Sequence, residues 1–323
     1  MFDLTPLHNN LKTFCATLGQ NPTIIVGLSG GPDSVFLLYL FKAIQKEMGC
    51  SIIAAHLNHG WRAEATQDAR WCQELCKQLD IPFIAGHAND YPVDKKYQGS
   101  AEAVGRKQRQ LFFAAVKTQY SAQAIALGHH QDDQIETFFI RLARGSSLSG
   151  LHGMAAHDGS YLRPLLSTSK QEILAYLDKH HIAYLTDATN TQDGYLRNRI
   201  RKHLVPALDI CDPRFSASII STMEQLANED AFLQTLAKDA FKKIFNEQKQ
   251  ALQQELLALP DVLLRRVILY WLIDQQVSFT PSTGLLAEII KFLTTPHGGQ
   301  HQISSSHTLI KQKGQIWLEF TGR

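Results

Sequence analysis

Long apolar runs are missing from this 323-residue sequence, so it contains no stretch of about 18 residues that would span a membrane. Its first residues, Met1–Phe14, also lack the basic segment followed by an apolar stretch that marks a secretory signal. The five cysteines are odd in number and scattered, which excludes the regular framework of a disulfide-stabilised secreted domain. These absences predict a cytoplasmic protein with reduced thiols and no membrane partner.

A strong charge of either sign is also missing, because the formal net charge is only +2. The chain has 21 basic and 18 acidic residues up to Pro206, and 11 basic and 12 acidic residues after it. Neither part has the basic excess that by itself indicates nucleic-acid binding. If the protein binds RNA, we expect local basic clusters to do so.

The only close cysteine pair, Cys72 and Cys76, lies in a helical pattern. Structural metal sites usually use a C-x-x-C pair, and these two cysteines are spaced four apart. We therefore interpret them as half-buried helix residues and predict no metal there.

Hydrophobic residues make up 44% of the chain, enough for a large core and more than one domain. Up to about Thr118, short β-rich runs alternate with longer helical patterns, and one further run follows. The predicted strands are Thr23–Leu28, Ser51–Leu57, Ile81–Ala85 and Gln123–Leu127. This alternation predicts an α/β fold with a mostly parallel sheet, in which ligands bind at the carboxyl ends of strands.

The pattern changes after Arg144. A loop of small residues, RGSSLSGLHGM, precedes a helix that starts near Ser169, and a basic helix follows at Tyr195–Leu208. The segment CDP at Cys211–Pro213 suggests a boundary. We predict domains at residues 1–210 and 211–323, the second smaller and mainly α-helical, with a terminal hairpin near residues 308–320.

The sharpest motif is SGGPDS, between a predicted strand and a predicted helix. Glycines let the backbone approach a ligand closely, and a helix N-terminus attracts phosphate through its unpaired amides and partial positive charge. Asp33 cannot bind phosphate directly, but it can hold Mg²⁺ against it. The residues predicted to bind phosphate are Ser29, Gly30, Gly31, Pro32, Asp33 and Ser34. The motif lacks the Walker lysine, and a tight turn with a Ser/Asp cap is its plain structural interpretation.

A second motif, GHHQDDQIETFFIRLARG, places acidic residues on a predicted helix. Asp133 and Glu136 are three apart, and Asp132 neighbours Glu136 at four apart. Crowded carboxylates need a cation, and Mg²⁺ or an amine substrate would serve. Spacing alone leaves an acidic helix start, stabilised by the helix dipole, equally open. His129 and His130 are assigned no role.

The basic helix predicts two faces. Arg197 and Arg201 are four apart and share one face, while Arg199 points nearly opposite. One helix could therefore contact both active-site phosphate and RNA backbone, although an exposed, solvated helix is the alternative.

The SGGPDS motif resembles the SGGxDS loop of the N-type ATP pyrophosphatases. This resemblance implies the adenine nucleotide alpha hydrolase-like fold and cleavage of ATP between its α and β phosphates. It also implies that an oxygen of the substrate becomes adenylated and that diphosphate is released.

Several further motifs, in order, resemble bacterial tRNA(Ile)-lysidine synthetases: GHHQDDQIET, RGSSLSGLHGM, LRPLL and DATN…YLRNRIRKHLVPAL. HLNHGWR at His56–Arg62 resembles the family's H-x-D-H-G-x-R, and AEAVGRKQRQ at Ala101–Gln110 resembles a helix with two arginines. The resemblance implies a ligase that joins L-lysine to C2 of the wobble cytidine of CAU-anticodon tRNA(Ile). The C2 oxygen is adenylated first, and the product, lysidine, changes decoding from Met to Ile.

Residue by residue, the resemblance implies roles in that reaction. Asp33 and Asp133 would handle Mg²⁺ or phosphate, Glu136 would bind or activate the lysine amine, and Arg106 would stabilise phosphate or the adenylated intermediate. Arg197, Arg199 and Arg201 would contact phosphate or tRNA. It also implies that the chain has no room for the additional domain of longer members, and it leaves a homodimer open.

The sequence departs from the family pattern at Asn58, where Asp is usual, at Gln110, where Tyr is usual, and at Ala188, where Pro is common. These departures affect local loop geometry. The alternative function is a tRNA cytidine thiolation enzyme with the same ATP loop, but related thiolation enzymes use paired cysteines, often C-x-x-C. An amidotransferase-type synthetase would need a glutaminase domain, and none is visible. A non-catalytic RNA-binding module would not need the acidic residues.

Overall fold

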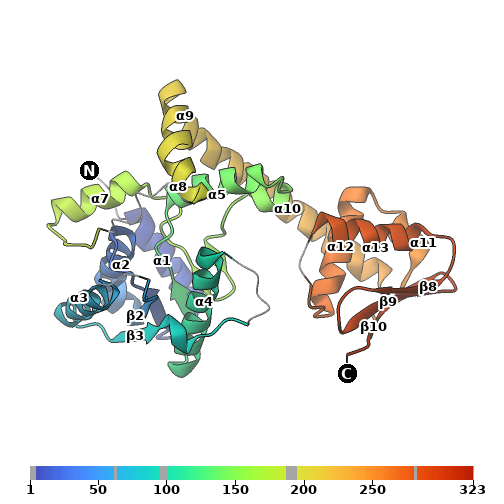
Figure 1. The fold of residues 1–323 in the computed structure, drawn as a ribbon, viewed down its shortest axis with the longest axis horizontal. Coiled ribbons are helices and arrows are strands. Elements are labelled where there is room, and N and C mark those ends of the chain that lie inside the picture. The colour runs from blue at the N-terminus through green and yellow to red at the C-terminus, as the bar shows by residue number, and fades with distance from the viewer. Residues whose placement is uncertain (1–4, 62–63, 95–99, 187–194, 280–281, 323) are drawn as a thin grey trace. The chain divides into compact units, whose positions relative to one another are not determined.

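The computed structural model describes residues 5–61, 64–94, 100–186, 195–279 and 282–322. The chain divides into two compact units, Met1–Met223 and Glu224–Arg323 (Figure 1). Helix α10, Phe215–Ile244, runs across this division. The boundary expected between residues 210 and 211 precedes this helix and stays a prediction.

The first unit alternates strands with helices over most of its length. Its strands are β1 (Thr23–Gly27), β2 (Ser51–Asn58), β3 (Phe83–His87), β4 (Ala124–Ala126), β5 (His157–Asp158) and β6 (Tyr161–Leu162). Its helices before α10 are α1 (Thr5–Thr17), α2 (Pro32–Met48), α3 (Ala65–Gln78), η1 (Ala88–Asp90), α4 (Ala101–Gln119), α5 (Gln131–Ala143), α6 (Leu148–Leu151), α7 (Lys170–Lys179), α8 (Leu196–Arg199), η3 (Ile200–Leu204) and α9 (Val205–Cys211).

The six strands form one sheet in the order β3-β2-β1-β4-β6-β5. Every neighbouring pair is parallel except β5 and β6, which are antiparallel. The carboxyl ends of β1, β2 and β4 therefore lie at one edge of the sheet, and the segments that follow them meet there. This arrangement confirms the predicted α/β class.

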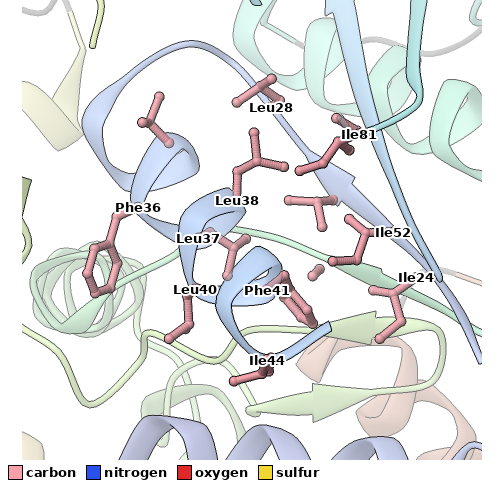
Figure 2. Packing of buried hydrophobic residues seen from close by; sticks show 14 of the residues in the cluster. Ile24, Leu28, Phe36, Leu37, Leu38, Leu40, Phe41, Ile44, Ile52 and Ile81 are labelled. Atoms are coloured by element: carbon pink, nitrogen blue, oxygen red, sulfur yellow. The ribbon is translucent and has the colours of Figure 1, made fainter. Parts of the chain in front are cut away.

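Alternate residues of β1 pack into layers on opposite faces of the sheet. Ile24 and Val26 join a core with residues of α1, α2, α3 and α7, whereas Ile25 joins a second core with residues of α4. Figure 2 shows the first of these cores, where Leu37 and Phe41 of α2 lie beside the strands. Both faces of β1 are buried, which explains its continuous apolar sequence.

The predicted strands occur with ends shifted by one or two residues, and the shift is largest at β3. We expected Ile81–Ala85, but the strand begins at Phe83 because Pro82 has no N–H to donate to a ladder. Its carbonyl still accepts a hydrogen bond from Ala54 N at 2.9 Å. Strands β5 and β6 have two residues each, too few for any alternation, and the sequence did not predict them.

The second unit combines helices with an antiparallel sheet. After α10 come β7 (Ala251–Leu252), α11 (Gln253–Leu257), α12 (Asp261–Asp274), α13 (Thr283–Thr294), β8 (Gly299–Gln302), β9 (His307–Gln312) and β10 (Gln315–Phe320). Strands β9 and β10 form the predicted hairpin, and β7 and β8 extend it to four strands in the order β7-β10-β9-β8. Trp271 lies at the centre of this unit's core and is 1% exposed.

Within the described ranges, no helix is long and apolar enough to cross a membrane.

Replacing Leu37 by Ala should destabilise the protein by about 2–5 kcal/mol, because the side chain is fully buried in α2 and its loss leaves a cavity. Leu142→Ala is the matched control. That leucine is 49% exposed near the end of α5, so its truncation should cost under about 1 kcal/mol. Urea unfolding measures both values, and equal losses would contradict the packing described for α2.

Candidate functional site

A tight turn joins β1 to α2 at the carboxyl edge of the sheet. Gly30 has a φ of +89°, which favours glycine, and a Cβ there would lie 2.6 Å from Leu185 Cδ1. Gly31 is the N-cap of α2 and provides no side-chain cap. The amides of the first helical turn are therefore available to an anion.

Two serines hold this turn together. Ser29 N donates to Ser34 Oγ at 3.1 Å, and Ser34 Oγ donates to the Gly31 carbonyl at 2.9 Å. The two hydroxyls are themselves 3.1 Å apart. Gly128, after β4, packs so closely that a Cβ would lie 3.0 Å from Asp33 C and O. The loop at residues 29–34 thus has a fixed backbone with both hydroxyls at its centre.

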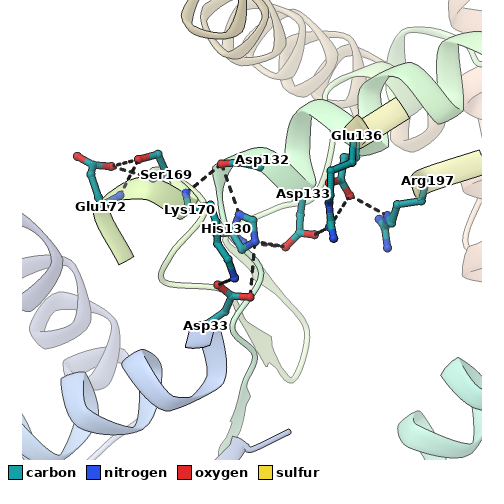
Figure 3. Close-up of polar contacts among 10 residues, drawn as sticks. Asp33, His130, Asp132, Asp133, Glu136, Ser169, Lys170, Glu172 and Arg197 are labelled. Carbon is teal, nitrogen blue, oxygen red and sulfur yellow. Dashed lines mark hydrogen bonds and ion pairs between the residues drawn. The ribbon is translucent and has the colours of Figure 1, made fainter. Parts of the chain in front are cut away.

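His130 lies among three carboxylates at the start of α5 (Figure 3). Its Nε2 is 3.7 Å from Asp33 Oδ2 and 3.6 Å from Asp133 Oδ2, and its Nδ1 is 3.6 Å from Asp132 Oδ1. Its backbone N–H donates to Asp133 Oδ2 at 3.0 Å. The histidine therefore connects the phosphate loop to the acidic helix, two segments about 100 residues apart in the sequence.

These carboxylates favour the charged form of His130. Burial alone would lower the pKa of this histidine, but Asp132, Asp133 and Asp33 outweigh burial and raise it. Burial would likewise raise the pKa of Asp132, yet His130 and the backbone amide of Lys170 lower it. The three carboxylates thus stabilise the protonated form of His130, which would offset part of their negative charge.

Lys170 is a second cation at the same place. It begins α7 after a capping box between Ser169 and Glu172, and its Nζ lies 2.5 Å from Asp33 Oδ1. Its backbone N–H donates to Asp132 Oδ1 at 3.0 Å. The phosphate loop lacks a lysine of its own, and α7 brings a lysine ammonium beside it.

Glu136 is buried, 1% exposed, and paired with two arginines. Arg201 Nε donates to Glu136 Oε1 at 2.5 Å, and its Nη2 donates to Oε2 at 3.2 Å. Arg197 Nε lies 3.1 Å from Oε2. Burial raises the pKa of Glu136 and Arg201 opposes that rise, with a net upward shift. Arg201 also lies 3.9 Å from Asp133 Oδ1, which links this group to the His130 cluster.

The basic helix is not a regular α-helix. Ile200–Leu204 forms a π-helical turn, in which Val205 N donates to the Ile200 carbonyl. Pro206 explains this turn, because proline has no N–H to donate and its ring clashes with the carbonyl four residues earlier. The structure nevertheless brings Arg197 and Arg201 together on Glu136, and Arg199 is exposed.

Arg106 lies on α4 with its side chain exposed. The positive charge of Arg106 lowers the pKa values of His129, Arg141 and Arg163, so these four basic side chains lie near one another. Burial lowers the pKa of His129 to about 4, despite Asp133, and the charges of Arg163 and Arg106 add to this lowering. His129 is therefore neutral at pH 7, whereas the pKa of His130 is shifted upward.

The sequence analysis did not predict that Lys170 and Arg163 belong to the site, or that His130 links its two acidic segments. Lys170 follows the capping-box serine, Ser169. Arg163 directly follows β6, so a search for charged residues at strand ends would have found it if β6 had been predicted. His130 has no such signal, because its importance comes from three carboxylates on two elements. Arg62 and the segment 187–190, which carry part of the resemblance, lie outside the described residues.

The carboxylates beside the phosphate loop are candidate ligands for a metal ion. Among the described residues, no group of three or more His, Cys, Asp or Glu side chains is placed to hold a metal by itself. Mg²⁺, however, is usually held by one or two carboxylates together with substrate phosphates. Asp33 of α2 and Asp133 of α5 lie 3.7 and 3.6 Å from the same atom, His130 Nε2. Two carboxylates from different helices therefore meet beside the phosphate loop, and this pair fits that requirement.

A strand, a glycine turn and an uncapped helix start with this geometry form a phosphate-binding loop of the kind found in α/β nucleotide-binding domains. The family model described as a PP-loop domain matches residues 4–208. A relative named tRNA(Ile)-lysidine synthase from Francisella tularensis is 32% identical over 303 residues, which cover 92% of this chain and 73% of that protein. The chain belongs to the tRNA(Ile)-lysidine synthase family, and ATP use follows from its PP-loop domain.

Relatives with the same name occur in Bacillus cereus (strain ATCC 10987), 33% identical over 312 residues, and Bacillus subtilis (strain 168), 34% identical over 292 residues. The matches cover 92% and 87% of this chain, but the chain spans only 64% and 61% of those relatives. A solved U34-tRNA thiolase, NcsA from Methanococcus maripaludis, described with its 4Fe–4S cluster, is similar with a TM-score of 0.57 at 20% identity. This match covers 69% of this chain and 78% of the thiolase, and shows a shared fold alone.

Cysteine reactivity tests the burial of the five thiols. Cys15, Cys50, Cys72 and Cys76 are buried and Cys211 is exposed, and all five are free thiols. Burial raises the pKa of Cys72 and of Cys76 to about 12, so neither forms a thiolate at pH 8. A disulfide-exchange reagent should label one thiol rapidly in the native protein and five after denaturation. Fast labelling of Cys72 or Cys76, located by peptide mapping, would contradict this assignment.

Proposed function

We propose that this protein ligates L-lysine to C2 of the wobble cytidine of tRNA(Ile) with a CAU anticodon, in the cytoplasm. The observation that supports this most is the continuous series of ionisable groups from the ATP loop to Glu136, through Asp33, His130, Asp133 and Arg201. This connection supports a reaction in which the nucleotide and the amine bind close together. The family relatives carry the name of this reaction.

In the first step, the C2 oxygen of the cytidine would attack the α-phosphorus of ATP. A phosphorus–oxygen bond forms, the bond to the bridging β-phosphate oxygen breaks, and diphosphate leaves. The amides of α2 and the hydroxyls of Ser29 and Ser34 would bind the phosphates, and Lys170 would offset their charge. Arg106 would stabilise the adenylated intermediate. Mg²⁺, held by Asp33 and Asp133, would supply further positive charge against the phosphates when bound.

In the second step, the lysine ε-amine would attack C2 and displace AMP. A lysine amine has a free pKa of about 10.4, so it must lose a proton to attack. We assign that proton to Glu136, because burial raises the pKa of its carboxyl and a raised pKa favours proton uptake. Arg197 and Arg201 hold the carboxylate in place.

The thiolation alternative has less support. In the described part of the chain no cysteine-containing group is placed to hold a metal, and the pKa values of Cys72 and Cys76 are raised to about 12 by burial. The thiolase structure shares the fold alone. A homodimer is compatible with the proposal and is not required by it.

Purified protein with ATP, Mg²⁺, labelled lysine and unmodified CAU-anticodon tRNA(Ile) should incorporate lysine into the tRNA and release diphosphate. Asp33→Ala should reduce diphosphate release to below about 1% of wild type, because it removes a carboxylate beside the phosphate loop. Asp178→Ala, an exposed change in α7, is the matched control and should retain activity. The proposal is wrong if AMP forms only with a sulfur donor and no lysine is incorporated.

Substitutions on the two faces of the basic helix should affect different quantities, turnover on one face and tRNA affinity on the other. Arg201→Ala removes a partner of buried Glu136 and should lower turnover about 100-fold with little change in tRNA affinity. Arg199→Ala should weaken tRNA binding and reduce the salt dependence of its affinity by about one phosphate contact, with turnover at saturation preserved. Single-turnover rates and filter binding at several salt concentrations measure both, and identical effects would refute two separate faces.

A further inference from the structure

Trp61 is an unusual residue to find on the surface, because 63% of it is exposed. It follows β2 at the carboxyl edge of the sheet, after a turn in which Gly60 has a φ of +66°. Gly60 N donates to Asn58 Oδ1 at 2.8 Å, which fixes the turn. A large aromatic ring held at the end of a fixed turn has an exposed surface available to a ligand.

The indole ring is held on two sides. The His59 ring stacks on it, with centroids 4.5 Å apart and planes 25° from parallel. On α4, a Cβ at Gly105 would lie 2.5 Å from Trp61 Cη2 and 2.6 Å from Cζ2. The ring therefore lies directly against the α4 backbone, where only glycine leaves room. A ring fixed in this way loses little conformational entropy when a ligand stacks on it.

Basic residues of α4 lie near the ring. Arg109 Nη2 lies 3.4 Å from His59 Nε2, and burial together with Arg109 lowers the pKa of His59 to about 4. His59 is therefore neutral at pH 7, and Arg109 supplies the charge. The exposed residues Arg106 and Lys107 lie on the same helix, and the sequence of α4 has four basic residues and one acidic residue, Glu102.

A flat aromatic surface beside guanidinium and ammonium groups matches an unpaired nucleotide, since the base can stack and the phosphate can pair with the cation. The same edge of the sheet carries the ATP loop: β2 pairs in parallel with β1, and His56 of β2 donates from Nδ1 to the Leu28 carbonyl at 2.9 Å. A base bound at Trp61 therefore lies on the side of the sheet where the reaction is proposed.

We propose that Trp61, stacked on His59 and flanked by Arg109, is a stacking platform for an unpaired base of the tRNA anticodon loop. This inference rests on the proposed function for its choice of RNA. A cytidine that enters a reaction site leaves its neighbour in the loop without a stacking partner. The Trp61 ring replaces that partner, so it positions the loop and does not take part in the chemistry.

The test uses an anticodon stem–loop of tRNA(Ile) with 2-aminopurine placed at each loop position in turn, since stacking quenches its fluorescence. Wild-type protein should quench one position strongly. Trp61→Ala should abolish that quench and raise the dissociation constant about 5- to 150-fold, the range measured for base–aromatic stacking. Trp61→Phe keeps a ring and should retain most of both signals. Trp61→Leu, which is apolar without a ring, should behave like Trp61→Ala.

ATP binding, measured with a fluorescent ATP analogue, should be equal in wild type and Trp61→Ala, and this also shows that the variant is folded. Weaker ATP binding with unchanged RNA binding would assign the ring to adenine and overturn the platform. Unchanged quenching in Trp61→Ala, or wild-type affinity in Trp61→Leu, would overturn it as well, as would wild-type protein that fails to bind the stem–loop. If wild type binds and quenches but incorporates no lysine, the proposed reaction fails and the platform stands.

Discussion

The buried carboxylate of Glu136 is the constraint on which the rest of the site depends. A charge in that position is unfavourable unless it is paired, and Arg201 and Arg197 pair it from a helix far along the chain. Their bonds fix α8 and η3 against α5. Because Arg201 also approaches Asp133, the same contact orients the start of α5, and with it the His130 cluster beside the phosphate loop.

Charge balance is continuous across the site. Asp33 is matched by Lys170 and His130, and Glu136 by two arginines. Lys170, Arg197 and Arg201 come from α7, α8 and η3, so the site requires several elements to be packed correctly at once. In the proposed reaction, phosphate and amine groups would enter a network whose charges already alternate, which lowers the reorganisation needed when they bind.

Features that leave a hydrophobic periodicity or a short local motif could be predicted from the sequence. The buried strand at Ile24–Val26 and the loop at residues 29–34 follow from apolar runs and glycine chemistry, and Arg197 and Arg201 share a partner as their spacing indicated. The remainder depends on non-local contacts. Two-residue strands give no pattern, the π turn depends on how Pro206 is accommodated, and His130 owes its raised pKa to carboxylates on α2 and α5 that no spacing rule connects.

The order of these charges along the chain has a consequence for biosynthesis. Asp33, Asp133 and Glu136 emerge from the ribosome before Lys170, Arg197 and Arg201, the lysine and arginines that pair with them. A nascent chain that ends before Ser169 therefore carries crowded carboxylates without those partners, and like charges in a buried site oppose close packing. The acidic helix should settle against the phosphate loop late in synthesis. Glu136 would then gain both of its arginine partners only after residue 201 is made.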